Sequence, residues 1–220
     1  MSVQVKICGI STEAALDAAI DGGAHYVGLV SYPKSPRHVE PPLAQRLAAH
    51  ARSKRAGIKV VALVVDADDR ALRRLNESVK PDIFQLHGGE TPDRVGVIAA
   101  MTGRAIWKAV SVNSRDGVAD ADVYLRPGCA DLILFDAKPS GAADALPGGN
   151  GLTFDWTMLD AWSRPFVLAG GLTPDNVAAA IELTGAPIVD VSSGVESAPG
   201  VKDPELIRRF LEAAKTAKQT

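Results

Sequence analysis

The sequence predicts an α/β protein with the (β/α)8 architecture of a TIM barrel. Short apolar strands alternate with amphipathic helical stretches throughout the 220 residues, and eight strand–helix units follow one another at spacings of about 20 to 30 residues. An open doubly wound sheet is the alternative, but it usually has fewer strands, and no Gly-x-Gly-x-x-Gly pattern follows the first strand. No linker or low-complexity tract divides the chain, so we expect a single domain over residues 1–220.

The strands are predicted from short runs of apolar residues, which suit a parallel sheet covered by helices. In chain order they are 3–8, 26–30, 59–65, 83–86, 105–110, 132–136, 166–169 and 188–191. Helices are predicted where the apolar residues between these runs recur on one helical face. These are 12–21, 41–56, 68–80, 92–101, 115–125, 154–162, 174–183 and 204–215. The pattern over 115–125 is the weakest of the set.

Composition excludes several classes of protein. The net charge is −2 with acids and bases interspersed, which is not the basic surface that a nucleic-acid partner requires. Cys8 and Cys129 are far apart in sequence and form neither a disulfide framework nor a zinc motif, so we expect no metal, and we interpret Cys129 as structural. The first residues are polar, and no apolar run approaches the roughly 20 residues of a membrane helix. We therefore expect a cytoplasmic protein with no membrane partner.

Two glycine- and serine-containing turns predict a phosphate site. Active sites of barrels lie at the C-terminal ends of the strands, and the loops after strands 7 and 8 often bind phosphate. Backbone amides at such turns and at helix N-termini point at anions. Two tight turns with helix caps are the alternative, but their place on these two adjacent strands favours phosphate. The predicted phosphate-binding residues are Gly170, Gly171, Leu172, Ser192, Ser193 and Gly194.

Cys8 ends the first strand and is a candidate catalytic residue. Strand alternation places Lys6 and Cys8 on one face, opposite Val3, Val5 and Ile7, which suit packing against helices. Lys6 and Cys8 should therefore point into the barrel, with Cys8 at its mouth and Lys6 as a charged plug below it. A free cysteine is most often a small buried hydrophobe, but the position at a strand end favours function.

Four further side chains, at strand ends or in the loops that follow them, are candidates. Asp136 ends the sixth strand after four apolar residues, where loss of water favours the neutral carboxyl that a general acid needs; the alternative is an aspartate that caps local amides. Arg37 could be a solvated loop residue or a bidentate clamp on a carboxylate. His87 could be structural or contact substrate. Asp190, at the end of the eighth strand, is a further candidate for substrate binding.

The ordered set of motifs resembles the phosphoribosylanthranilate isomerase family over nearly the whole chain. The matching pieces are KICG at 6–9, YPKSPR at 32–37, QLHG at 85–88, LFD at 134–136, GGNG at 148–151, FDW at 154–156, AGGL at 169–172, DVSSGVE at 190–196 and PGVKD at 199–203. Single pieces are weak signals, but the set in this order is highly specific. One departure is GLVS at 28–31, where family members often carry Gly-Phe-Val-Phe, so contacts to the anthranilate ring should be made differently.

The resemblance implies an Amadori rearrangement of N-(5-phosphoribosyl)anthranilate, without metal or organic cofactor. It implies that Cys8 is the general base, that Asp136 is the general acid, and that Arg37 engages the anthranilate carboxylate. The loops at 170–172 and 192–194 would hold the phosphate of this small phosphosugar. The sequence does not fix whether the protein is a monomer or a homodimer. We also expect the long loops 31–42 and 137–152 to act as lids.

Other phosphosugar enzymes on the same scaffold are the nearest rivals. The histidine-pathway isomerase performs the same chemistry but uses aspartates for both roles, so Cys8 argues against it. Indoleglycerol phosphate synthase needs a lysine and glutamates at strand ends, and only Lys6 is near such a position; the tryptophan synthase α subunit is a third candidate. A non-catalytic phosphate-binding barrel would need neither Cys8 nor Asp136 at the mouth.

Overall fold

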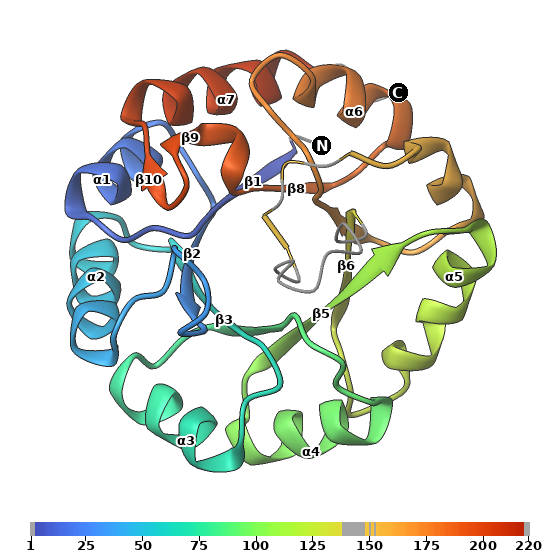
Figure 1. Cartoon of the computed structure of the whole chain (residues 1–220), viewed down its shortest axis with the longest axis horizontal. Helices are drawn as coiled ribbons and strands as arrows, with labels where there is room; N and C mark the ends of the chain where they lie inside the picture. The colour runs from blue at the N-terminus through green and yellow to red at the C-terminus, as the bar shows by residue number, and fades with distance from the viewer. Residues whose placement is uncertain (1–2, 138–147, 150, 152, 218–220) are drawn as a thin grey trace.

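Eight parallel strands close into a barrel that is surrounded by helices (Figure 1). The computed structural model describes residues 3–137, 148–149, 151 and 153–217. Each strand pairs in parallel with the next, and β8 returns to pair with β1, in the order β1 to β8 around the barrel. The predicted (β/α)8 architecture is therefore confirmed, whereas the single-domain assignment of residues 1–220 stays a prediction.

The observed strands agree closely with those predicted. They are β1 Gln4–Cys8, β2 Tyr26–Ser31, β3 Lys59–Val64, β4 Ile83–Leu86, β5 Ala105–Val112, β6 Leu132–Ala137, β7 Phe166–Leu168 and β8 Ile188–Val191. The α-helices are α1 Glu13–Asp21, α2 Pro41–Lys54, α3 Asp69–Ser78, α4 Pro92–Thr102, α5 Arg115–Asp120, α6 Val177–Thr184 and α7 Pro204–Thr216. Side chains that accept hydrogen bonds from backbone amides begin several helices, among them Thr12 before α1 and Asp68 before α3.

The buried apolar side chains form three groups that follow the strand alternation. The largest group lies between the strands and the helices and includes Val5, Ile7 and Phe84. A second group, which includes Trp107 and Leu134, fills the barrel interior. Cys8, Val30 and Leu63 form a small third group. Alternate residues of one strand thus face the helices or the interior, and Cys8 occupies the interior face as predicted.

Three of the predicted helices need correction. The segment 115–125 is divided into α5 and a 3-10 helix, η1 Ala121–Leu125. The segment 154–162 is not an α-helix but the 3-10 helix η2 Trp156–Ala161. Its backbone hydrogen bonds run from the Met158 amide to the Asp155 carbonyl and from the Trp162 amide to the Leu159 carbonyl, a spacing of three residues that is typical of 3-10 geometry. The helix predicted at 174–183 begins three residues later, at Val177.

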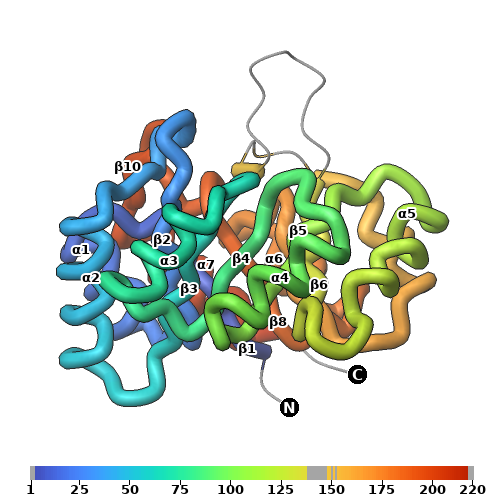
Figure 2. Tube along the Cα trace, turned by 90° about the horizontal axis from the view of Figure 1, so that it is seen from below, coloured from blue at the N-terminus to red at the C-terminus, as the bar shows by residue number. Residues whose placement is uncertain are grey.

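A small antiparallel hairpin after β8 was not predicted. After the 3-10 helix η3 Ser193–Val195, the strands β9 Glu196–Ala198 and β10 Val201–Lys202 pair with each other. Figure 2 shows β10 at one end of the barrel, opposite the end where β1 begins. The hairpin therefore lies at the end where the C-termini of the parallel strands meet. Within the described residues, no helix is long and apolar enough to cross a membrane.

Candidate active site

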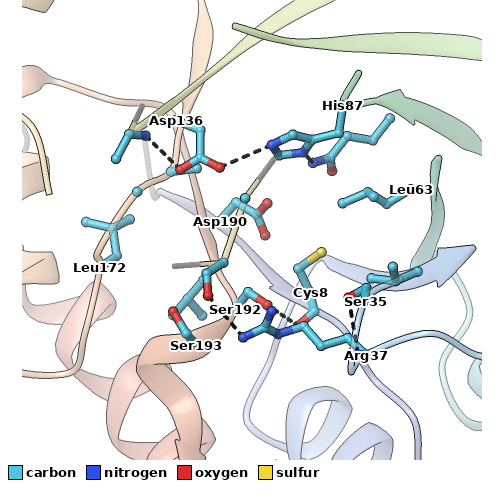
Figure 3. Close-up of a pocket in the computed structure, with 18 of the residues that line it drawn as sticks. Cys8, Ser35, Arg37, Leu63, His87, Asp136, Leu172, Asp190, Ser192 and Ser193 are labelled. Carbon is cyan, nitrogen blue, oxygen red and sulfur yellow. Dashed lines mark hydrogen bonds and ion pairs between the residues drawn. The ribbon is translucent and has the colours of Figure 1, made fainter. Parts of the chain in front are cut away.

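A pocket of about 770 Å³, including the space open to solvent, lies at the C-terminal ends of the strands (Figure 3). The residues predicted from sequence to form a site meet here. Its lining includes Cys8, Arg37, His87, Asp136, Gly170, Gly171, Leu172, Asp190, Ser192 and Ser193. Gly194 does not line the pocket but lies against the backbone of Leu172, which does. Side chains from the first, fourth, sixth and eighth strands thus converge on the glycine-containing turns.

Lys6 and Asp190 form a buried ion pair beneath Cys8. Lys6 Nζ donates to Asp190 Oδ2 at 2.8 Å, and the lysine side chain is fully buried. The pairing register of β1 with β8 sets the two residues opposite each other. A Cβ added to Gly28 of β2 would lie 2.8 Å from Cys8 Sγ and 3.1 Å from Lys6 Cε. A glycine is therefore required at position 28, since a larger residue would displace both side chains.

Burial raises the pKa of the Cys8 thiol, and the positive charge of Lys6 opposes that shift. Burial by itself would lower the pKa of Lys6, but the Asp190 carboxylate and Cys8 raise it, so Lys6 stays protonated. Lys6 therefore stabilises a Cys8 thiolate, but the exclusion of water from both side chains destabilises it more. Ionisation of Cys8 in the free protein therefore requires a higher pH than ionisation of an exposed cysteine does.

We expect a spectroscopic titration of the Cys8 thiolate to show this directly. The ultraviolet absorbance that the wild type gains on thiolate formation, after subtraction of the signal of Cys8→Ser, should have its midpoint above that of a free cysteine. Cys129→Ser serves as the control, because it removes the other thiol and should leave the Cys8 transition in place. A Cys8 midpoint at or below that of a free cysteine would contradict the expected direction.

Asp136 is held by its neighbours on both carboxylate oxygens. Its Oδ1 accepts from the Ala137 amide at 2.8 Å, and its Oδ2 lies 3.2 Å from His87 Nε2. The amide Nε2 of Gln85 donates to His87 Nδ1 at 3.0 Å, which leaves the proton of a neutral imidazole on Nε2, facing Asp136. His87 therefore contacts Asp136 directly, besides lining the pocket. In Figure 3, Cys8 and Asp136 project from different sides, with Asp190 drawn between them.

The two predicted phosphate loops pack against each other. A Cβ at Gly194 would lie only 1.9 Å from the carbonyl oxygen of Leu172, so only glycine permits this approach. Gly170 and Gly171 have φ values of 85° and 64°, in the left-handed region. Asn176 Nδ2 donates to the Gly171 carbonyl at 2.9 Å and fixes the turn from the helix side. The loops are thus shaped by backbone conformations that only glycine adopts readily and by the hydrogen bond from Asn176.

Arg37 is neither solvated nor unpaired. Its Nε and Nη2 donate to the two carboxylate oxygens of Glu196 at 2.7 and 2.8 Å, and Nη2 also donates to the Gly149 carbonyl at 3.1 Å. The bidentate clamp expected from the sequence thus exists, but here it holds a carboxylate of the protein itself. Lys202 Nζ reaches the same glutamate at 2.5 Å. Glu196 and Lys202 therefore belong to the site, although sequence reasoning gave neither a role.

Gly148 lies beside Asp136, and Gly149 lies beside Arg37. A Cβ at Gly148 would lie 2.7 Å from His87 Nε2 and 2.8 Å from Asp136 Oδ2, and one at Gly149 would lie 2.6 Å from Arg37 Nη1. The rest of the predicted lid at 137–152 lies largely outside the described residues. The other predicted lid, 31–42, contains turn hydrogen bonds and an isolated bridge between Val30 and His38. Whether it acts as a lid stays a prediction.

The fold and the pocket define a (β/α)8-barrel protein with a carboxyl and a thiol facing a mouth that is bordered by the glycine- and serine-containing turns after β7 and β8. Among the described residues, no group of three or more His, Cys, Asp or Glu side chains could hold a metal ion.

A sequence model of N-(5'phosphoribosyl)anthranilate (PRA) isomerase matches residues 5–213. The chain therefore belongs to this family of aldose–ketose isomerases of tryptophan biosynthesis.

Curated relatives carry the same name. The N-(5'-phosphoribosyl)anthranilate isomerase of Rhodospirillum centenum is 52% identical over 97% of this chain and 99% of its own length. That of Cereibacter sphaeroides is 53% identical over the same shares. Among solved structures, the Thermotoga maritima enzyme is 33% identical and has a TM-score of 0.83, covering 97% of this chain and 98% of its own.

A second solved relative, described as PRAI in complex with reduced 1-(o-carboxyphenylamino)-1-deoxyribulose 5-phosphate, is 32% identical with a TM-score of 0.80. It covers 97% of this chain and 98% of its own.

Proposed function

We propose that this chain converts N-(5-phosphoribosyl)anthranilate into 1-(2-carboxyphenylamino)-1-deoxyribulose 5-phosphate, with Asp136 as general acid and Cys8 as general base. The observation that carries the proposal is the convergence of these two side chains on one pocket bordered by the turns after β7 and β8. The solved relative bound to a reduced form of that product supports the choice of a phosphosugar ligand. The reaction is proposed to need no metal or organic cofactor, and to take place in the cytoplasm.

The first step opens the sugar ring. Asp136 in its protonated form gives its proton to the ring oxygen, and the bond between that oxygen and carbon 1 breaks. The nitrogen lone pair forms a double bond to carbon 1, which creates an iminium ion and leaves Asp136 as a carboxylate. His87 Nε2–H, 3.2 Å from Asp136 Oδ2, can donate to that carboxylate as it forms.

The second step transfers a proton from carbon 2 to Cys8. The thiolate takes this proton, the C–H electron pair becomes the C1=C2 double bond, and the iminium nitrogen becomes neutral. The nearby Lys6 cation favours the thiolate, and so does the positive iminium once it has formed. When the enolamine becomes the ketone, carbon 1 gains a proton and the hydroxyl on carbon 2 loses one. Cys8 then releases its proton to water and Asp136 takes one up, so that both side chains return to their starting charge.

The remaining candidates are proposed to bind the substrate. The amides and hydroxyls of Gly170–Gly171–Leu172 and Ser192–Ser193–Gly194 would hold the phosphate, remote from the reacting carbons. Binding energy from that end can position the sugar and lower the barrier. Asp190 Oδ1 is buried and has no hydrogen-bond partner among the described residues, so a sugar hydroxyl could satisfy it. His87 is proposed to contact the sugar as well as Asp136, and Arg37 the anthranilate carboxylate.

The proposed function is tested by following the fluorescence of N-(5-phosphoribosyl)anthranilate as the purified protein consumes it. We expect rapid loss of the signal, together with formation of the ketose product. The histidine-pathway aminoaldose serves as the comparison substrate, since it undergoes the same rearrangement. If the folded protein turned over only that comparison substrate, or neither one, the named reaction would be wrong.

A further inference from the structure

Three charged side chains form a buried cluster beside the pocket, and their charges do not cancel. Arg37, Glu196 and Lys202 have side-chain exposures of 6%, 4% and 1%. Two cations therefore share one carboxylate, and the cluster carries a charge of +1. An uncompensated buried charge is costly, so such a cluster is suited to a site where an anion supplies the missing charge.

Glu196 accepts hydrogen bonds from three residues, Arg37, Lys202 and Gly200. Both of its oxygens are taken by the Arg37 fork, Lys202 Nζ donates to Oε1, and the Gly200 amide donates to Oε2 at 3.2 Å. Burial alone would raise the pKa of Glu196, but the hydrogen bonds from Arg37 and the charge of Lys202 lower it. The carboxylate is thus charged and fixed in orientation by its partners.

The remaining nitrogen of the guanidinium is directed at the pocket. Nε and Nη2 of Arg37 are occupied by Glu196 and by the Gly149 carbonyl. Nη1 adjoins Gly149, which lines the pocket next to Gly148, and Gly148 adjoins Asp136. Arg37 Nη1 and Asp136 Oδ2 therefore lie beside two consecutive residues of the pocket lining.

We propose that Glu196 is a positioning residue that fixes the Arg37 guanidinium, so that its free edge selects substrates bearing a carboxylate on the aromatic ring. This inference rests on the proposed function for the identity of the ligand. Lys202 contacts both this glutamate and the turn after β8. Its Nζ donates to Glu196 Oε1, which also accepts from Arg37 Nε, and to the Ser192 carbonyl at 3.0 Å. Lys202 thereby connects the Arg37–Glu196 pair, which would bind the ring carboxylate, to the turn after β8.

The test compares two ligands: the reduced product analogue with its ring carboxylate, and the same molecule without it. In the wild type the carboxylate should improve affinity by about tenfold or more, as a charge-assisted hydrogen bond does. In Glu196→Gln this preference should fall to about threefold or less, while affinity for the ligand without the carboxylate is retained. Turnover should show a raised KM with kcat within about threefold.

Further variants separate positioning from a merely structural role. Glu196→Asp keeps the charge and should keep part of the preference, even where Glu196→Gln folds poorly. In an Arg37→Met background, Glu196→Gln should cause no further loss of preference. Glu205→Gln, which alters an exposed glutamate paired with Arg208 on α7, is the matched control. An unchanged preference in both Glu196 variants, or equal losses for both ligands, would overturn the proposal.

Because the two analogues are compared by binding, the result does not depend on turnover. If the wild type did not isomerise N-(5-phosphoribosyl)anthranilate, but Glu196→Gln still had a smaller carboxylate preference than the wild type, only the proposed function would be refuted. If the wild type were active, but the Glu196 variants kept the wild-type preference for the ligand with the carboxylate, only the inference about Glu196 would be refuted.

Discussion

Replacing Asp136 with asparagine is expected to lower kcat by about 10² to 10⁴-fold, the usual contribution of a positioned general acid. Asparagine has the same shape and can still accept the hydrogen bond that the Ala137 amide gives to Oδ1. It cannot deliver a proton to the ring oxygen, so ring opening should become rate-limiting. Affinity for the reduced product analogue should stay within about threefold, because the phosphate and carboxylate contacts are untouched.

An isotope experiment sharpens this prediction. If ring opening limits the variant, a deuterium on carbon 2 of the sugar should have almost no effect on its kcat, since that C–H bond breaks later. Asp155→Asn is the matched control: Asp155 accepts from the Thr157 amide at the exposed start of η2 and does not line the pocket. If Asp136→Asn had the same kcat as the wild type, Asp136 would not be the general acid.

Replacing Cys8 with serine is expected to cause a second large loss, again about 10² to 10⁴-fold in kcat. A serine hydroxyl fits the same space beside Gly28 but ionises far less readily than a thiol. The backbone contact in which Ser192 Oγ donates to the Cys8 carbonyl does not use the side chain and should remain. Analogue binding and the free energy of unfolding should therefore change little.

The two variants should differ in which bond limits turnover. In Cys8→Ser the removal of the proton from carbon 2 becomes slow, so deuterium at that carbon should lower kcat severalfold. Cys129→Ser, made at the other buried thiol, should leave both rate and isotope effect as in the wild type. Cys8→Ser with full activity would mean that another group accepts the proton.

Local patterns predicted the strands well because their geometry is fixed by the chain itself. The alternation of Val5, Lys6, Ile7 and Cys8 determines which side chains face the barrel interior, whatever the neighbouring strands are. The ion pair between Lys6 and Asp190 could not be predicted in the same way. It depends on the pairing register of the first strand with the last, and that register is set by closure of the whole barrel.

The environment of Arg37 shows the limit of reasoning from short motifs. Its sequence neighbours are polar and proline-rich, which is equally typical of an exposed loop. Its partner Glu196 lies 159 residues away in a hairpin whose strands have only three and two residues. Strands this short carry too few alternating positions to give a pattern, so neither the hairpin nor the buried carboxylate could be identified beforehand.

The closure of β8 onto β1 also orders events during protein synthesis. Lys6 leaves the ribosome long before Asp190, its partner beneath Cys8, which is 184 residues further along. Contacts of such long sequence separation form late in folding. Glu196 and Lys202, which hold Arg37, are synthesised later still. A nascent chain should therefore be unable to bind its ligand until the residues through Lys202 have emerged, however early its first strands fold.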